Sequence, residues 1–167
     1  MLTYMPSSKP VTSGRNSRRR QLVIDGITAL FVLLWIYAAV SKLMDYETFR
    51  LQLGKSPMLT SFAPVVTWAI PAMEILTAML LLFGKTRFTG LYASLLLMTI
   101  FTAYIITMLD FSSYVPCSCG GVLEKLSWTQ HIYFNLAFVL LAIAGILLEV
   151  KHHGRSTGIG VYKPGAG

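Results

Sequence analysis

The sequence predicts an all-α fold: an integral membrane four-helix bundle with its N and C termini in the cytoplasm. The first observation is composition, because 54% of the 167 residues are hydrophobic and only 13% are charged. Soluble domains carry about 25% charged residues, so this chain has too few charges to cover a water-facing surface. The second is that four apolar runs reach roughly 20 residues, the length that a helix needs to cross a bilayer. The third is an uneven distribution of Lys and Arg, which sets the orientation of such spans.

The four apolar runs predict membrane spans at about 22–41, 62–83, 88–109 and 128–149. The third run has no charged residue, whereas Asp25 lies near the start of the first and Glu74 lies inside the second. A cleaved signal peptide is the alternative interpretation of the first run. A retained span is favoured, because the run exceeds the roughly 7–15 apolar residues of a signal peptide and no small-residue cleavage site follows it.

The positive residues predict the orientation. Ten of the 14 Lys and Arg residues lie in the N-terminal arm, the link at 84–87 and the tail, whereas the loops at 42–61 and 110–127 hold four. Because Lys and Arg collect on the cytoplasmic side, we expect a multi-pass protein of the bacterial inner membrane with both loops in the periplasm. The net charge of +7 is then attributed to the Lys and Arg residues that orient the spans in the membrane. The lipid bilayer is the expected environment, and no nucleic acid partner is expected.

The predicted transmembrane domain is 21–150, and it is flanked by two segments without apolar periodicity. Residues 1–20 contain Pro, Ser and a cluster of Arg, which predicts a mobile basic arm, and the glycine-rich residues 151–167 predict a flexible tail. The loop at 42–61 mixes apolar and charged residues at near-helical spacing. It is therefore expected to lie along the outer membrane surface as an amphipathic segment.

The only two cysteines, Cys117 and Cys119, lie in the second predicted periplasmic loop. Outside the cytosol such a pair can form a disulfide, and a strained, exposed disulfide is typical of labile or catalytic bridges. A purely structural staple would remove little chain entropy from so short a loop, so redox activity is the favoured interpretation. A structural or inert pair and a site for soft metal ions remain the alternatives. Too few ligands are visible for a closed zinc site.

A local sequence pattern locates the beginning of the last span. Ser127 followed by Gln130 is a capping-box pattern, which predicts that the fourth helix begins near Trp128. On this helix Trp128, His131 and Asn135 share one face. A helix N-terminus carries partial positive charge, so cysteines folded back over it would have a lowered thiol pKa.

Two groups near the cysteines are candidate acid–base residues for thiol exchange. His131 could donate or accept the proton of the attacking or leaving sulfur, and Glu124 is the second candidate. Each residue also has a plainer interpretation. His131 could be a packing residue, Glu124 could form a solvated pair with Lys125, Trp128 could anchor the helix at the interface and Asn135 could bond between helices.

Glu74 is unusual because of its depth. It lies about 12 residues inside the second span, or about 18 Å along a helix, close to the middle of the bilayer. A carboxyl group there is costly and indicates a functional site by default. The alternative is a residue that locks the bundle by bonding to the third span, through groups such as Thr99, Thr102 or Tyr104.

Three blocks of this sequence carry a family resemblance: SKL at 41–43, PAMEILTAMLLLFG around Glu74, and CSCGG with LSWTQHIYFN from Cys117 to Asn135. Over 22–149 the chain resembles the MauE-type, DoxX-like membrane proteins described as redox-associated. This resemblance implies a four-helix protein tied to periplasmic thiol chemistry, MauE-type members being linked to maturation of a disulfide-rich periplasmic dehydrogenase. The plan is also similar to vitamin K epoxide reductase-like and DsbB-like enzymes, which connect a thioredoxin-fold partner to a quinone. Those enzymes use a CxxC pair, whereas this chain has a single CxC.

The favoured function is therefore a membrane thiol–disulfide component. Its cysteine pair would exchange electrons with a periplasmic thioredoxin-like partner or assist maturation of an envelope protein. A quinone is the candidate cofactor, and Glu74, Trp128 and Asn135 are candidates for a quinone or lipid pocket. The alternative function is a non-enzymatic subunit or scaffold of a larger envelope complex, in which the disulfide is structural.

Overall fold

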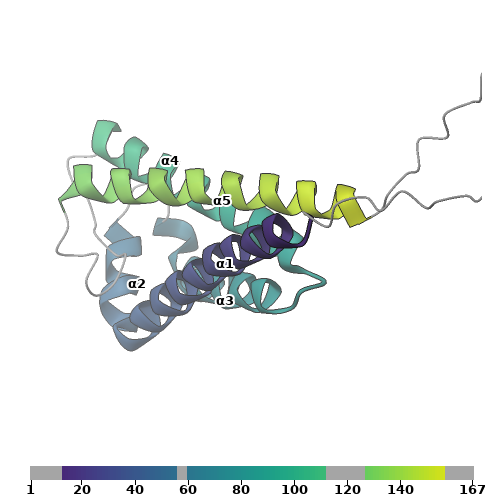
Figure 1. Ribbon diagram of the computed structural model, residues 1–167. Helices are drawn as coiled ribbons and strands as arrows, with labels where there is room; N and C mark the ends of the chain where they lie inside the picture. Colours follow the sequence, from purple (N-terminus) through teal and green to yellow (C-terminus); the bar gives the residue numbers. More distant parts are fainter. Residues whose placement is uncertain (1–12, 56–59, 112–126, 157–167) are drawn as a thin grey trace, which may run out of the picture.

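The computed structural model describes residues 13–55, 60–111 and 127–156, all of which belong to helices or their short connections (Figure 1). Four of the helices are long and apolar enough to cross a membrane, which confirms the predicted all-α fold with four spans. The elements are α1 (Ser13–Met44), α2 (Tyr46–Lys55), the short 3-10 helix η1 (Thr60–Phe62), α3 (Ala63–Leu82), α4 (Arg87–Phe111) and α5 (Trp128–Ser156).

Helices α1 and α5 both extend beyond their predicted spans. Helix α1 begins at Ser13, so the last part of the predicted N-terminal arm is helical, in keeping with the high helix propensity of its arginines. Helix α5 continues to Ser156, into the predicted tail. The rest of the predicted arm and tail, 1–12 and 157–167, lies outside the described residues.

The four spanning helices form a bundle in which each helix has two close neighbours. Helix α1 packs on α3 and α5, and α4 packs on the same two helices, with the largest contacts between α1 and α3 and between α4 and α5. Figure 1 shows which parts of the chain lie at each end of the bundle. Both described chain ends, Ser13 and Ser156, and the link between α3 and α4 lie at one end, here called the terminal end. The last turn of α1, helix α2 and the start of α5 lie at the other, here called the loop end.

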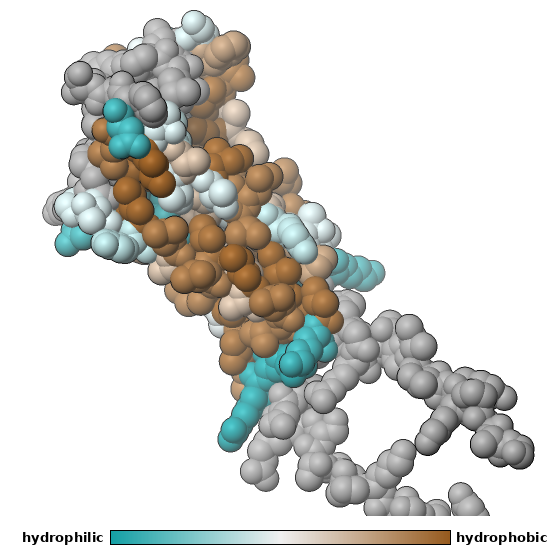
Figure 2. Space-filling view, turned by 90° about the horizontal axis from the view of Figure 1, so that it is seen from above, coloured by the Kyte–Doolittle hydropathy of each residue, from teal (hydrophilic) through white to brown (hydrophobic). Residues whose placement is uncertain are grey.

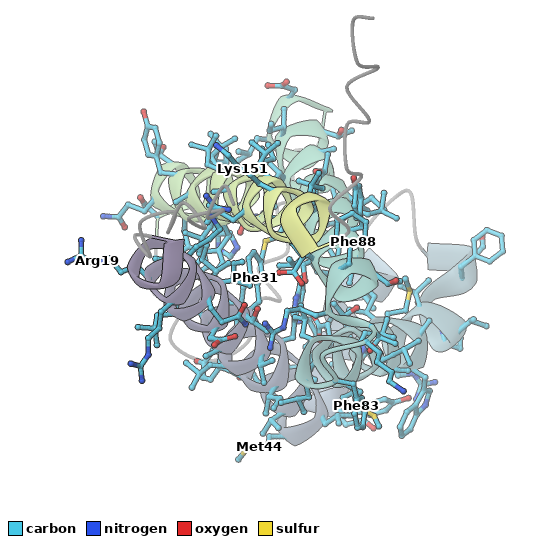
Figure 3. The ribbon with its side chains drawn as sticks, turned by 45° about the vertical axis from the view of Figure 1, so that its right-hand side comes forward. Arg19, Phe31, Met44, Phe83, Phe88 and Lys151 are labelled. Carbon is cyan, nitrogen blue, oxygen red and sulfur yellow. The ribbon has the colours of Figure 1, made fainter. Side chains whose placement is uncertain are left out.

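The core of the bundle is built from large apolar side chains of all four spans. In Figure 3 Phe31 of α1 points between the helices, whereas Arg19 and Met44 point away from them. Phe31 stacks edge-on against Phe138 of α5, with ring centroids 5.3 Å apart. Across the bundle, Trp35 Nε1 of α1 donates a buried hydrogen bond of 2.9 Å to Ser94 Oγ of α4. These contacts tie α1 to both helices of the α4–α5 pair.

Glycines allow the closest helix contacts. A Cβ atom on Gly90 of α4 would lie 2.9 Å from both the backbone nitrogen and the side chain of Leu81 on α3. A Cβ atom on Gly145 of α5 would lie 3.3 Å from side-chain carbons of Ile27 and Leu91. Small residues at these positions therefore let the helix axes approach closely, as in other membrane bundles.

The outer surface of the bundle is apolar. Large hydrophobic side chains are exposed along all four spans, for example Leu33, Leu76, Leu96 and Leu140. On the face seen in Figure 2, hydrophobic residues form a broad band with hydrophilic groups toward its ends. This is the surface expected of a bundle surrounded by lipid.

Candidate functional site

The polar centre of the bundle is an ion pair between two spanning helices. Lys42 Nζ of α1 lies 2.7 Å from Glu74 Oε1 of α3, and the two side chains are only 8% and 0% exposed. The same ammonium donates a hydrogen bond of 3.3 Å to the carbonyl oxygen of Ala38 and lies 6.0 Å from the ring centroid of Phe101 on α4. The pair is therefore enclosed by α1, α3 and α4.

Helix α2 covers the beginning of α3. It packs its apolar residues Phe49 and Leu53 against Ala63 at the beginning of α3, with Ile70 alongside. Lys42, two residues before the end of α1, meets Glu74, which lies about halfway along the 20 residues of α3.

The face of α3 that carries Glu74 is almost entirely buried. Thr67, Pro71, Thr77 and Ala78 share it at helical spacing. Pro71 has no N–H group, so it removes one backbone hydrogen bond from the interior of the helix. The hydroxyl of Thr67 donates to the carbonyl oxygen of Ala63 in the preceding turn. Polar groups are thus concentrated on one side of a span that is otherwise apolar.

The partner of Glu74 differs from the one that the sequence suggested. The expected partners were hydroxyl groups of the third span, but Thr99 and Thr102 donate to the carbonyl oxygens of Leu95 and Met98 in their own helix. The actual partner, Lys42, had been placed in the outer loop at 42–61. It follows the first apolar run directly, so its charge alone gave no signal that it is buried.

The beginning of α5 has the predicted capping box. Gln130 N–H donates a hydrogen bond of 3.4 Å to Ser127 Oγ, and Ser127 N–H donates one of 3.0 Å to Gln130 Oε1. Helix α5 begins at Trp128, as predicted. His131 and Asn135 lie one turn apart and are only 3% and 4% exposed, so both side chains face the bundle at its loop end.

Several predicted site residues lie outside the described residues. These are Cys117, Cys119 and Glu124, together with the side chain of Trp128. Their proposed roles in thiol chemistry remain predictions. Among the residues that the structure does describe, no group of three or more His, Cys, Asp or Glu side chains could hold a metal ion.

The ion pair and the α5 face belong to different helix contacts. Glu74 lies on α3, which packs on α1 and α4, whereas His131 and Asn135 lie on α5, which packs on α4 and α1. Helices α3 and α5 are thus diagonal to each other in the bundle. A single pocket lined by Glu74, Trp128 and Asn135 would have to extend across the bundle from α3 to α5. Such a pocket remains a prediction.

A second polar cluster lies at the terminal end. Arg87 Nη1, at the start of α4, forms an ion pair of 2.8 Å with Asp25 Oδ1 of α1. Gln21 Nε2 donates a hydrogen bond of 3.0 Å to the same oxygen. Arg20 Nη1 reaches the carbonyl oxygen of Lys151 on α5 at 3.4 Å. The only acidic residue of the first span is therefore paired with a cation at the start of α4.

Comparison with known families decides the relationship of this chain. The family model described as methylamine utilisation protein MauE matches residues 20–148, more than half of the sequence. This chain belongs to the MauE family. No curated protein and no solved structure matches it.

The MauE match extends over the features described above. It includes the ion pair of Lys42 and Glu74, the segment with both cysteines, and His131 and Asn135. The predicted resemblance to MauE-type proteins is thereby confirmed. Together with the four apolar helices, membership identifies this chain as a multi-pass membrane protein in a context related to methylamine utilisation.

Proposed function

We propose that this MauE family member is a thiol–disulfide component of the bacterial inner membrane. Cys117 and Cys119 are its redox pair, and their loop faces the periplasm. A thiolate of a thioredoxin-fold partner or a maturing envelope protein attacks the disulfide of this pair and forms a mixed disulfide, and the other cysteine leaves as a thiolate. A second thiolate of the partner then displaces the cysteine that is still bound. The partner gains a disulfide, the chain gains two thiols, and no further oxidant is needed for the exchange.

The observation that carries this proposal is the beginning of α5. The cysteine segment leads directly into a capped helix start, and the first residues of that helix to face the bundle are His131 and Asn135. An imidazole there is a suitable proton carrier for the attacking or leaving sulfur. Glu124 is proposed as the second acid–base group, and Asn135 and Trp128 as residues that shape the site.

A quinone is not needed for this exchange. A quinone would be the electron acceptor that regenerates the disulfide. The residues predicted for its pocket are Glu74, Trp128 and Asn135. In the described residues Glu74 is bound by Lys42, and its helix is diagonal to α5. Electron transfer to a quinone is therefore no part of the proposal.

The redox state of the cysteine pair tests the proposal. Membranes containing the full chain are treated with a thiol-alkylating reagent before and after mild reduction, and the pair is titrated against a glutathione couple. We expect a pair that is oxidised in the cell, with a potential of roughly −120 to −270 mV, the range of oxidoreductases. Single Cys117→Ser and Cys119→Ser variants are the controls, because each should trap a mixed disulfide with the partner.

Two outcomes would replace the proposal. A bridge that resists reduction below about −300 mV is structural and would favour the scaffold function, in which replacing both cysteines by Ser weakens stability or association but not activity. Thiols that react only after a chelator is added would favour a metal site.

A further inference from the structure

The two carboxylate oxygens of Glu74 have different surroundings. Oε1 accepts a hydrogen bond of 2.7 Å from Lys42, whereas Oε2 is buried and has no hydrogen-bond partner within the part of the chain that the structure describes. Lys42 directs two of its three N–H groups to Glu74 and to the carbonyl oxygen of Ala38. A buried polar atom without a partner is rare and calls for an explanation, such as a bound molecule.

The charge of the pair restricts what such a molecule can be. An ammonium and a carboxylate together are neutral, so a bound ion would add an uncompensated charge in the apolar interior, which is costly. The complement of the site is a neutral group that donates a hydrogen bond to Oε2. A hydroxyl group does this, and its oxygen can also accept from the third N–H of Lys42.

The neighbourhood of the pair favours a flat aromatic ligand. The Phe101 ring lies beside Lys42 at 6.0 Å, and Trp35 lies next to Phe101 with ring centroids 6.2 Å apart. Aromatic rings pack well against such side chains. We propose that Lys42 and Glu74 form a binding site for the hydroxyl group of a small, membrane-soluble phenol.

A matched pair of probes tests this site directly. The probes are 2-fluoro-4-hexylphenol and its methyl ether, which has the same ring and tail but no O–H donor. Binding to the full chain in lipid nanodiscs is followed by fluorine NMR, with empty nanodiscs measuring partition into lipid. A hydrogen bond to a charged group contributes about 1.5–3 kcal/mol, so the phenol should bind about 10- to 150-fold more tightly than the ether.

Variants assign this preference to the ion pair. The double variant Lys42→Met with Glu74→Leu replaces the pair by apolar residues of similar size, which buried sites tolerate; circular dichroism and size-exclusion chromatography verify its fold. It should bind the two probes equally. The control removes the other ion pair, Asp25→Asn with Arg87→Gln, and should keep the preference.

Three results would overturn the inference. They are equal binding of both probes by the unmodified chain, a preference that survives in the double apolar variant, and no binding above that of empty nanodiscs, which would assign Oε2 to a water molecule. The inference does not rest on thiol exchange. A chain with Cys117→Ser and Cys119→Ser should bind the phenol unchanged, so this test and the redox test fail independently.

Discussion

Lys42 and Glu74 depend on each other, because neither charge is exposed to solvent. Removing one partner leaves the other charge buried and unpaired, which typically costs about 3–5 kcal/mol, whereas an apolar pair is often neutral or stabilising. We expect Lys42→Met to lower the free energy of unfolding by about that amount, and the double variant with Glu74→Leu to recover most of it. Unfolding by SDS in mixed micelles measures both values. A single variant as stable as the unmodified chain would show that the pair opens to water or lipid headgroups.

Three glycines form a graded test of helix packing. A Cβ atom would collide with Leu81 at Gly90, would lie at a tight 3.3 Å from its neighbours at Gly145, and would meet nothing within 4 Å at Gly26. We expect Gly90→Ala to destabilise by about 1–3 kcal/mol through overpacking and Gly145→Ala to do so less. Gly26→Ala should stabilise by up to about 1 kcal/mol, because alanine favours the helix. The same SDS titration ranks the three variants, and an equal effect at Gly90 and Gly26 would contradict the close contact of α3 and α4.

At this scale the sequence predicted one member of the ion pair and missed the other. Glu74 was recognisable because a carboxyl group interrupts an apolar run. Lys42 was not, since it directly follows a run and a lysine there normally reaches the membrane surface. Lys42 lies near Glu74 of α3 and Phe101 of α4, and such tertiary contacts have no local pattern in the sequence.

Among the elements, the start of α5 was more predictable than the start of α1. The capping box at Ser127 and Gln130 is a local pattern, and both of its hydrogen bonds are present. The extension of α1 back to Ser13 was missed, because an Arg-rich segment has no apolar periodicity although arginine is a good helix former. The cysteine segment at 112–126 lies outside the described residues, so its part of the candidate site is still a prediction.

The capping box should control order at the start of α5. Ser127→Ala removes the side chain that accepts from Gln130 N–H, and loss of such a cap costs about 1 kcal/mol. We expect faster amide hydrogen exchange at Gln130 and His131, by about 5-fold at this energy, and no change in the middle of α5. Thr129→Ala, at an exposed position in the same turn, is the matched control. Equal protection in both variants would mean that packing of His131, and not the cap, holds this turn.

For the molecule as a whole, hydropathy predicted how many helices span the membrane but not which of them are neighbours. The order around the bundle, α1, α3, α4 and α5, follows from side-chain fit. One contact between neighbours is the edge-on packing of Phe31 on α1 against Phe138 on α5. The two ion pairs leave the orientation argument unchanged. Lys42, one of the four cations assigned to the loop side, is paired inside the bundle, and Arg87, one of the ten on the terminal side, is paired with Asp25, so the surplus of the other Lys and Arg residues on the terminal side stays the same.

That surplus predicts that the terminal end faces the cytoplasm. Two exposed positions report the two ends: Thr48 on α2 at the loop end and Gly84 in the link at the terminal end. In a chain with Cys117→Ser and Cys119→Ser, we expect an impermeant maleimide to label Thr48→Cys from outside intact spheroplasts and Gly84→Cys only in inside-out vesicles. Reversed labelling would place the cysteine loop in the cytoplasm, where thiols are kept reduced, and would remove the basis of periplasmic disulfide exchange. Labelling of both positions from one side would contradict the four-span arrangement itself, because an odd number of spans separates Thr48 from Gly84.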